Sequence, residues 1–125
     1  MLLLNSAGRI SDRLIACLAR SRRDSEKLLH VPDYDPVGLS DYLRLRCVLG
    51  DRVTLFVPSD LDQRFARFGN RDLITQKQRN RDLLEQLATK EWPCATSARV
   101  FQLILETGCG LEQECLLLTK SPESK

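Results

Sequence analysis

The sequence predicts an all-α protein, a compact antiparallel bundle of six helices. Three observations predict this class: apolar residues recur at helical spacing along most of the chain, prolines and glycines are scarce, and several of these stand where a helix would begin or end. A chain of 125 residues, 42% hydrophobic and 29% charged, suits one globular domain. We therefore expect an N-terminal extension over residues 1–9, the bundle over 10–120 and a polar tail over 121–125.

The first expected helix covers about residues 10–29. Its apolar stripe consists of Ile10, Leu14, Ile15 and Leu18. The stripe is interrupted at residues 21–23, where we expect a bend. The sequence HVPDYDP, which follows, contains two prolines that disfavour a helix interior, so we interpret it as a connector.

The second expected helix, residues 36–49, has the clearest boundaries. Asp35 is a typical N-cap, and Pro36 suits the first helical position because its missing N–H is not needed there. Gly50 supplies the stop, since glycine adopts the left-handed turn at little cost. The next segment, RVTLFV (residues 52–57), has strand propensity. Because we find no partner strand for it, we expect an extended loop packed into the bundle.

Four further helices are expected in the second half of the chain. Ser59 with Asp62, and Thr75 with Gln78, have the spacing of capping boxes at helix starts. Gly69 and Gly108 follow apolar stripes and indicate helix ends. The expected ranges are 60–68, 75–90, 94–107 and a short last helix at about 111–118.

The chain lacks a convincing constellation for catalysis or metal binding. Its one histidine is His30, and its five cysteines include no CxxC pair. Four cysteines fall in apolar helical patterns, so we expect reduced, buried thiols in a cytoplasmic protein. Cys94 at a helix start is best explained as a small residue near the cap, and the Asp33/Asp35 and Asp60/Asp62 pairs as solvated carboxylates. We expect no enzyme activity and no cofactor.

The sequence contains no apolar run of the ~18–20 residues that a membrane span needs. The first 23 residues hold five arginines and one acidic residue, a composition similar to a mitochondrial presequence. An ordinary amphipathic helix with a basic face explains the same composition, and we prefer that interpretation.

Charge is distributed unevenly along the chain although the net charge is only +2. One interpretation of this charge distribution is a solvated surface. The more specific interpretation is a pair of opposed docking faces, which would let the domain bind a relative or itself head to tail. The candidate basic face consists of Arg13, Arg20, Arg22, Arg23, Lys77, Arg79 and Arg81. The candidate acidic face consists of Asp33, Asp35, Asp41, Asp60 and Asp62, with Asp51 nearby.

Two stretches carry a family resemblance. DPVGLSDYLRLRCVLGD (residues 35–51), with its Tyr42-Leu43 and Val48-Leu49 pairs, resembles the second helix of caspase recruitment domains of the death-fold superfamily. RNRDLLEQLATK and ARVFQLILETG, within residues 79–108, are similar to the fourth and fifth helices of that family, and CGLEQECLLLTK to its closing helix. The family's usual glycine between its fourth and fifth helices is replaced here by KEWPC.

The resemblance implies a six-helix Greek-key bundle and homotypic assembly in apoptotic or inflammatory signalling, as an adaptor or as the prodomain of a larger protein such as an initiator caspase. The implied partner is another caspase recruitment domain or a second copy, in a helical oligomer. Two alternatives stay open. One is a nucleic-acid-binding protein that uses the basic residues, although the small net charge counts against it. The other is a death-effector-type relative. Such domains usually carry an arginine–x–aspartate–leucine motif, and the sequence NRDLL in this chain differs from that spacing by one residue.

Overall fold

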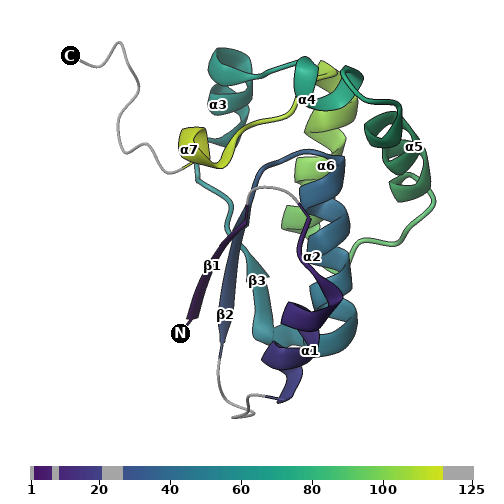
Figure 1. The fold of residues 1–125 in the computed structure, drawn as a ribbon. Helices are drawn as coiled ribbons and strands as arrows, with labels where there is room; N and C mark the ends of the chain where they lie inside the picture. Colours follow the sequence, from purple (N-terminus) through teal and green to yellow (C-terminus); the bar gives the residue numbers. More distant parts are fainter. Residues whose placement is uncertain (1, 7–8, 21–26, 117–125) are drawn as a thin grey trace.

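The computed structural model describes residues 2–6, 9–20 and 27–116. Within these ranges the chain is mostly helical, with seven α-helices and a small three-stranded sheet (Figure 1). The expected helical character is therefore found, but an all-α class is not confirmed, and neither is a Greek-key bundle.

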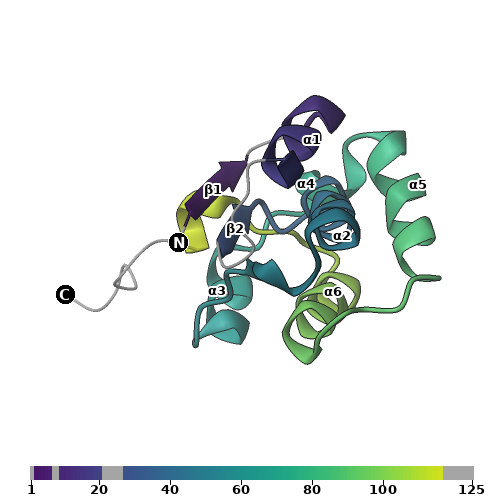
Figure 2. The ribbon, with the colours of Figure 1, turned by 90° about the horizontal axis from the view of Figure 1, so that it is seen from below.

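The sheet is entirely parallel and has the strand order β1-β2-β3. Its strands are β1 (Leu2–Ser6), β2 (Leu28–Pro32) and β3 (Val53–Leu55). Helices α1 (Asp12–Arg20) and α2 (Pro36–Leu49) connect successive strands. The first half of the chain is thus a β-α-β-α-β unit, and Figure 2 shows α1 and α2 on the same side of its sheet, as equal-handed crossovers between neighbouring strands require.

Three sequence-based assignments are corrected by this sheet. Residues 1–9, expected as an extension, contain β1, and the expected loop at 52–57 contains β3. The first helix was expected to reach residue 29, but α1 ends at Arg20. Leu28 and Leu29, which the expected helix included, are the first two residues of β2. Parallel strands are joined by helices, so the partner of each strand lies more than twenty residues away, where a search for a neighbouring hairpin strand cannot find it.

The boundaries of α2 match the expectation. The Asp35 carboxylate accepts a hydrogen bond of 2.7 Å from the Gly38 N–H, Pro36 occupies the first turn, and Gly50 ends the helix at a φ of 67°. Gly38 meets a steric requirement as well. A Cβ at that position would lie 2.0 Å from the Asp33 carbonyl oxygen, so only glycine lets α2 start this close to the end of β2.

The second half of the chain contains five short helices. They are α3 (Leu61–Phe68), α4 (Asp72–Thr75), α5 (Gln78–Leu87), α6 (Ala95–Thr107) and α7 (Gln113–Leu116). The helix expected over 75–90 corresponds to α5, which begins at Gln78, whereas α4 is a separate short helix that ends at Thr75, and neither expected capping box forms. The Thr75 hydroxyl instead donates to the Arg71 carbonyl at 3.1 Å, within its own helix. Gly108 ends α6 in the left-handed conformation, as expected.

Helix α2 lies at the centre of the core. Leu39, Tyr42 and Leu45 are completely buried, and so are Val100 and Ile104 of α6.

A buried polar cluster ties the start of α1 to α2. The Asp41 carboxylate accepts from the Ile10 N–H at 2.8 Å and from the Arg44 guanidinium at 2.7 Å, and Arg44 also donates to the Ile10 carbonyl and to Asp12. Two of these interactions, from the Ile10 N–H and from Arg44, replace the water that the Asp41 carboxylate loses on burial.

Candidate functional site

The two faces of the sheet differ in what covers them. On the face toward α1 and α2, Leu28, Val53 and Leu55 are buried. His30, on the same face, lies with its ring parallel to that of Tyr42 on α2, at a centroid distance of 6.4 Å. Burial lowers the pKa of His30 to about 4, so this imidazole is neutral at physiological pH. This face belongs to the hydrophobic core.

The opposite face carries a row of three residues in register, which we call the open window: Leu3, Leu29 and Thr54. Leu3 is 61% exposed, Leu29 is half-buried and Thr54 is exposed. None of the described elements covers this row. The window is unusual because parallel sheets are almost always covered on both faces.

The window is limited to the amino-terminal half of the strands. One step further along β2, on the same face, Val31 is only 1% exposed. Figures 1 and 2 show why: α3 and α7 lie on this side of the sheet, beside the carboxyl ends of the strands. Two helices therefore border the window at the carboxyl ends of the strands.

The carboxyl edge of the sheet is where open α/β sheets usually bind ligands, and here Asp33 and Asp35 follow β2. Burial raises the pKa of both carboxyl groups, that of Asp35 to about 6, and their mutual repulsion adds to the increase at Asp35. Both already have partners, because Asp33 accepts from the Gln113 N–H at 2.8 Å and Asp35 caps α2. Among the described residues, no three side chains come together as ligands for a metal ion.

A segment of the chain itself covers this edge. The Tyr34 and Leu111 backbones exchange hydrogen bonds of 2.7 and 3.0 Å, and the Arg64 guanidinium donates to the Cys115 carbonyl at 2.6 Å. The edge beyond β2 is thus occupied by residues 110–115 rather than open to a ligand.

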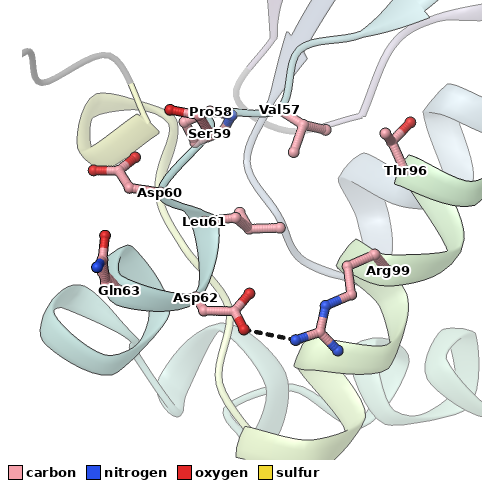
Figure 3. Close-up of a pocket in the computed structure, with 9 residues that line it drawn as sticks. All are labelled: Val57, Pro58, Ser59, Asp60, Leu61, Asp62, Gln63, Thr96 and Arg99. Carbon is pink, nitrogen blue, oxygen red and sulfur yellow. Dashed lines mark hydrogen bonds and ion pairs between the residues drawn. The ribbon is translucent and has the colours of Figure 1, made fainter.

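A pocket of about 400 Å³ lies beyond β3, between the β3–α3 connection and α6 (Figure 3). Asp62 and Arg99 point toward each other across it and form an ion pair of 2.7 Å. Thr96 and Ser59 add hydroxyl groups at its rim. The two charges neutralise each other and their side chains are 42% and 66% exposed, so this ion pair gives the pocket little charge with which to select a ligand.

Cys94 is the N-cap residue of α6 and has the most perturbed thiol among those described. Burial alone would raise its pKa, but hydrogen bonds from Ser97 and Thr96 lower the pKa to about 6. The sulfur lies 3.3 and 3.2 Å from those hydroxyl oxygens and 3.7 Å from the Tyr42 hydroxyl. A thiolate at this position is thereby stabilised, but no described residue is placed as a base or as a second thiol for chemistry.

All five cysteines are free thiols, but the expectation that they are buried is corrected. Cys17 and Cys47 are exposed and the other three are half-buried. Cys47 lines an apolar groove of about 600 Å³ between α1 and α2, beside Val48, which is 51% exposed. The helical pattern placed these cysteines near the apolar stripe, yet their side chains lie at its solvent margin.

The expected basic residues belong to two separate elements. Arg13 and Arg20 are exposed on α1, while Lys77, Arg79 and Arg81 are exposed at the start of α5. Both helices pack against α2, from different sides (Figure 2). Arg81 donates to the Thr75 carbonyl and to the Gln78 amide oxygen, each at 2.6 Å. Arg22 and Arg23 lie outside the described residues.

The expected acidic residues are mostly committed to partners within the chain. Asp41 is completely buried and therefore cannot form part of a docking face. Asp33 and Asp35 are held as described above. Asp60 pairs with Arg64 at 2.6 Å and Asp62 pairs with Arg99. Asp51 is exposed in the 3-10 turn Gly50–Arg52 that precedes β3.

No protein-family model, no curated protein and no solved structure matches the chain. The comparisons thus identify no caspase recruitment domain, and the resemblance remains a prediction. Within the described residues, no helix is long and apolar enough to cross a membrane.

Sequence reasoning missed the open window entirely. The available signal was the run of uncharged, mainly apolar residues in each strand, namely LLLNS, LLHVP and VTL. Three such runs separated by helical segments are typical of a parallel sheet, but only their register shows that Leu3, Leu29 and Thr54 share one face.

Proposed function

We propose that the chain is a protein–protein interaction module that assembles with copies of itself through the open window. The observation that carries this proposal is a parallel sheet on which no described element covers the row of Leu3, Leu29 and Thr54. Burying such a face removes apolar surface from water, and this is the main driving force of association.

A second copy is the partner that fits, since it brings an equally uncharged row of Leu3, Leu29 and Thr54. The adjoining edge supports association as well, because β1 contains no proline and no charged residue of the kind that shields an edge strand. The proposal retains the homotypic binding predicted from the resemblance but assigns the contact to the sheet rather than to charged faces. The module works by binding rather than by catalysis.

The test is sedimentation equilibrium of the purified chain from about 1 µM to about 1 mM, a range chosen because small interfaces bind weakly. The parent chain is expected to approach twice its monomer mass at the highest concentrations, and Leu3→Lys to remain monomeric. The matched control is Leu105→Lys, because Leu105 of α6 is similarly exposed, at 51%, but lies far from the window in the sequence and on another element.

A parent chain that stays monomeric throughout would contradict the proposal. Equal loss of association in Leu3→Lys and Leu105→Lys would contradict it too, because the window would then have no special role. Binding to DNA or RNA that falls steeply with salt would instead favour the nucleic-acid alternative.

A further inference from the structure

The two ends of the window differ, because described helices border one of them. Helices α3 and α7 lie beside the carboxyl ends of the strands, and no element of the described ranges covers the amino-terminal half of the same face, which we call the bare half (Figures 1 and 2). Two copies stacked with their strands parallel would bring these helices into collision. Two copies stacked antiparallel would place the helices of each beyond the bare half of the other.

From this shape we infer that the assembly is a closed dimer in which two open windows stack face to face, with antiparallel strands related by a two-fold axis running across them. The inference rests on the proposed self-assembly and adds its geometry. A two-fold contact uses the same patch on both copies and leaves none free for a third. It therefore predicts a dimer that does not grow, in contrast to the helical oligomer implied by the family resemblance.

Charge at the two ends of the window supports the antiparallel arrangement. Lys27 is exposed and directly precedes β2, at the bare end of the window. Glu112 and Glu114 are exposed at α7, at the opposite end. Antiparallel stacking brings Lys27 of each copy toward the acidic pair of the other, whereas parallel stacking brings like charges together.

Among the residues that the structure describes, the other charges near the bare end do not alter this balance. Asp51 and Arg52, which precede β3, contribute one charge of each sign. No charged residue lies in the row itself, so stacking the windows does not bury an unpaired charge.

The two-fold axis leads to a more specific prediction, because it places each residue of the row opposite the same residue of the other copy. Thr54 is the best residue to test, since it is exposed and lies on β3, across the sheet from the free β1 edge. Thr54→Lys and Thr54→Glu each place like charges face to face, whereas a mixture of the two variants places opposite charges face to face.

The experiment measures sedimentation equilibrium of Thr54→Lys, of Thr54→Glu and of their equimolar mixture. Each variant alone is expected to lose at least tenfold in dimer affinity, and the mixture is expected to recover it. The matched control pair is Leu105→Lys with Leu105→Glu, which is expected to dimerise like the parent both separately and mixed. Circular dichroism confirms that each variant is folded.

Several results would overturn the inference while leaving self-assembly in place. If the parent dimerises and the Thr54 variants dimerise equally well, the contact is elsewhere, for example along β1. If the mixture fails to recover affinity, the copies are not related by this axis. Masses that continue to rise above the dimer with concentration would show an open assembly.

The charge pairing provides a second, independent readout. Lys27→Glu is expected to weaken the dimer, and Lys27→Glu combined with Glu112→Lys and Glu114→Lys is expected to restore it, with the effect fading as salt increases. A triple variant that is weaker than Lys27→Glu alone would overturn the antiparallel arrangement.

Discussion

The two faces of one small sheet illustrate how the same strands serve different purposes. On the covered face, Leu28, Val53 and Leu55 are buried under helices, and the residues between them in sequence, Leu29 and Thr54, point the other way. Alternation along a strand sends neighbours to opposite sides. The comparison suggests that stability is concentrated on the covered face, whereas the open face contributes little to folding and is free to bind.

The largest expected contrast comes from shortening one leucine on each face. Leu55→Ala is expected to lower the free energy of unfolding by about 2–5 kcal/mol, because a fully buried side chain leaves a cavity. Leu29→Ala is expected to cost about 1 kcal/mol or less at dilutions where the chain is monomeric, since that side chain is already partly in water. Urea denaturation of both variants measures the difference, and equal losses would mean that the two faces are not distinct.

The polar cluster that holds the start of α1 tests the covered side in a different way. Asp41→Ala is expected to cost about 3 kcal/mol, because it leaves the Ile10 N–H and the buried part of Arg44 without their acceptor. Thermal unfolding measures this loss. Asp51→Ala is the matched control, since Asp51 is exposed and should change stability by about 0.5 kcal/mol at most. A neutral Asp41→Ala would show that packing alone holds α1.

The pH dependence of stability gives another test of the covered side, because His30 and Asp35 titrate there with opposite effects on the free energy of unfolding. His30 has its pKa lowered to about 4 from 6.5, so the unfolded chain binds more protons and stability rises with pH in that window. Asp35 has its pKa raised to about 6 from 3.8, so the folded chain binds more protons and its contribution is lost as pH rises.

Asp35→Asn isolates the histidine contribution, because asparagine also caps helices and does not titrate. The gain in stability between pH 4.5 and pH 6.5 is expected to be larger in Asp35→Asn than in the parent, by about 2 kcal/mol. Urea denaturation at the two pH values measures it. An unchanged gain would mean that Asp35 ionises in the folded chain as it does in the unfolded one.

The sequence predicts local features of this molecule far better than long-range ones. The limits of α2 follow from Asp35, Pro36 and Gly50, each of which acts on the backbone within a few residues. The end of α6 at Gly108 is equally local. The sheet depends on contacts that are distant in sequence, because β2 pairs with β1 and β3 and a helix separates it from each of them. In addition, a short apolar run alone cannot distinguish a buried strand from a helix segment.

The candidate site shows the same limit. The charged residues singled out from the sequence are visible as a pattern, but whether a carboxylate is free depends on its neighbours in space. Asp41, for example, is bound by Ile10 and Arg44, and Asp33 by Gln113, eighty positions away. The open window requires the register of three strands, which the pattern of charges does not encode.

Methyl NMR of the leucine-labelled chain during dilution tests the open window most directly. We expect the Leu3 and Leu29 methyl resonances to shift together with protein concentration, because these side chains leave water when two windows stack. The methyl resonances of Leu105, which is 51% exposed on α6, should stay fixed. Resonances of Leu3 and Leu29 that are independent of concentration up to about 1 mM, where weak interfaces are occupied, would contradict the claim that the open window is an interface.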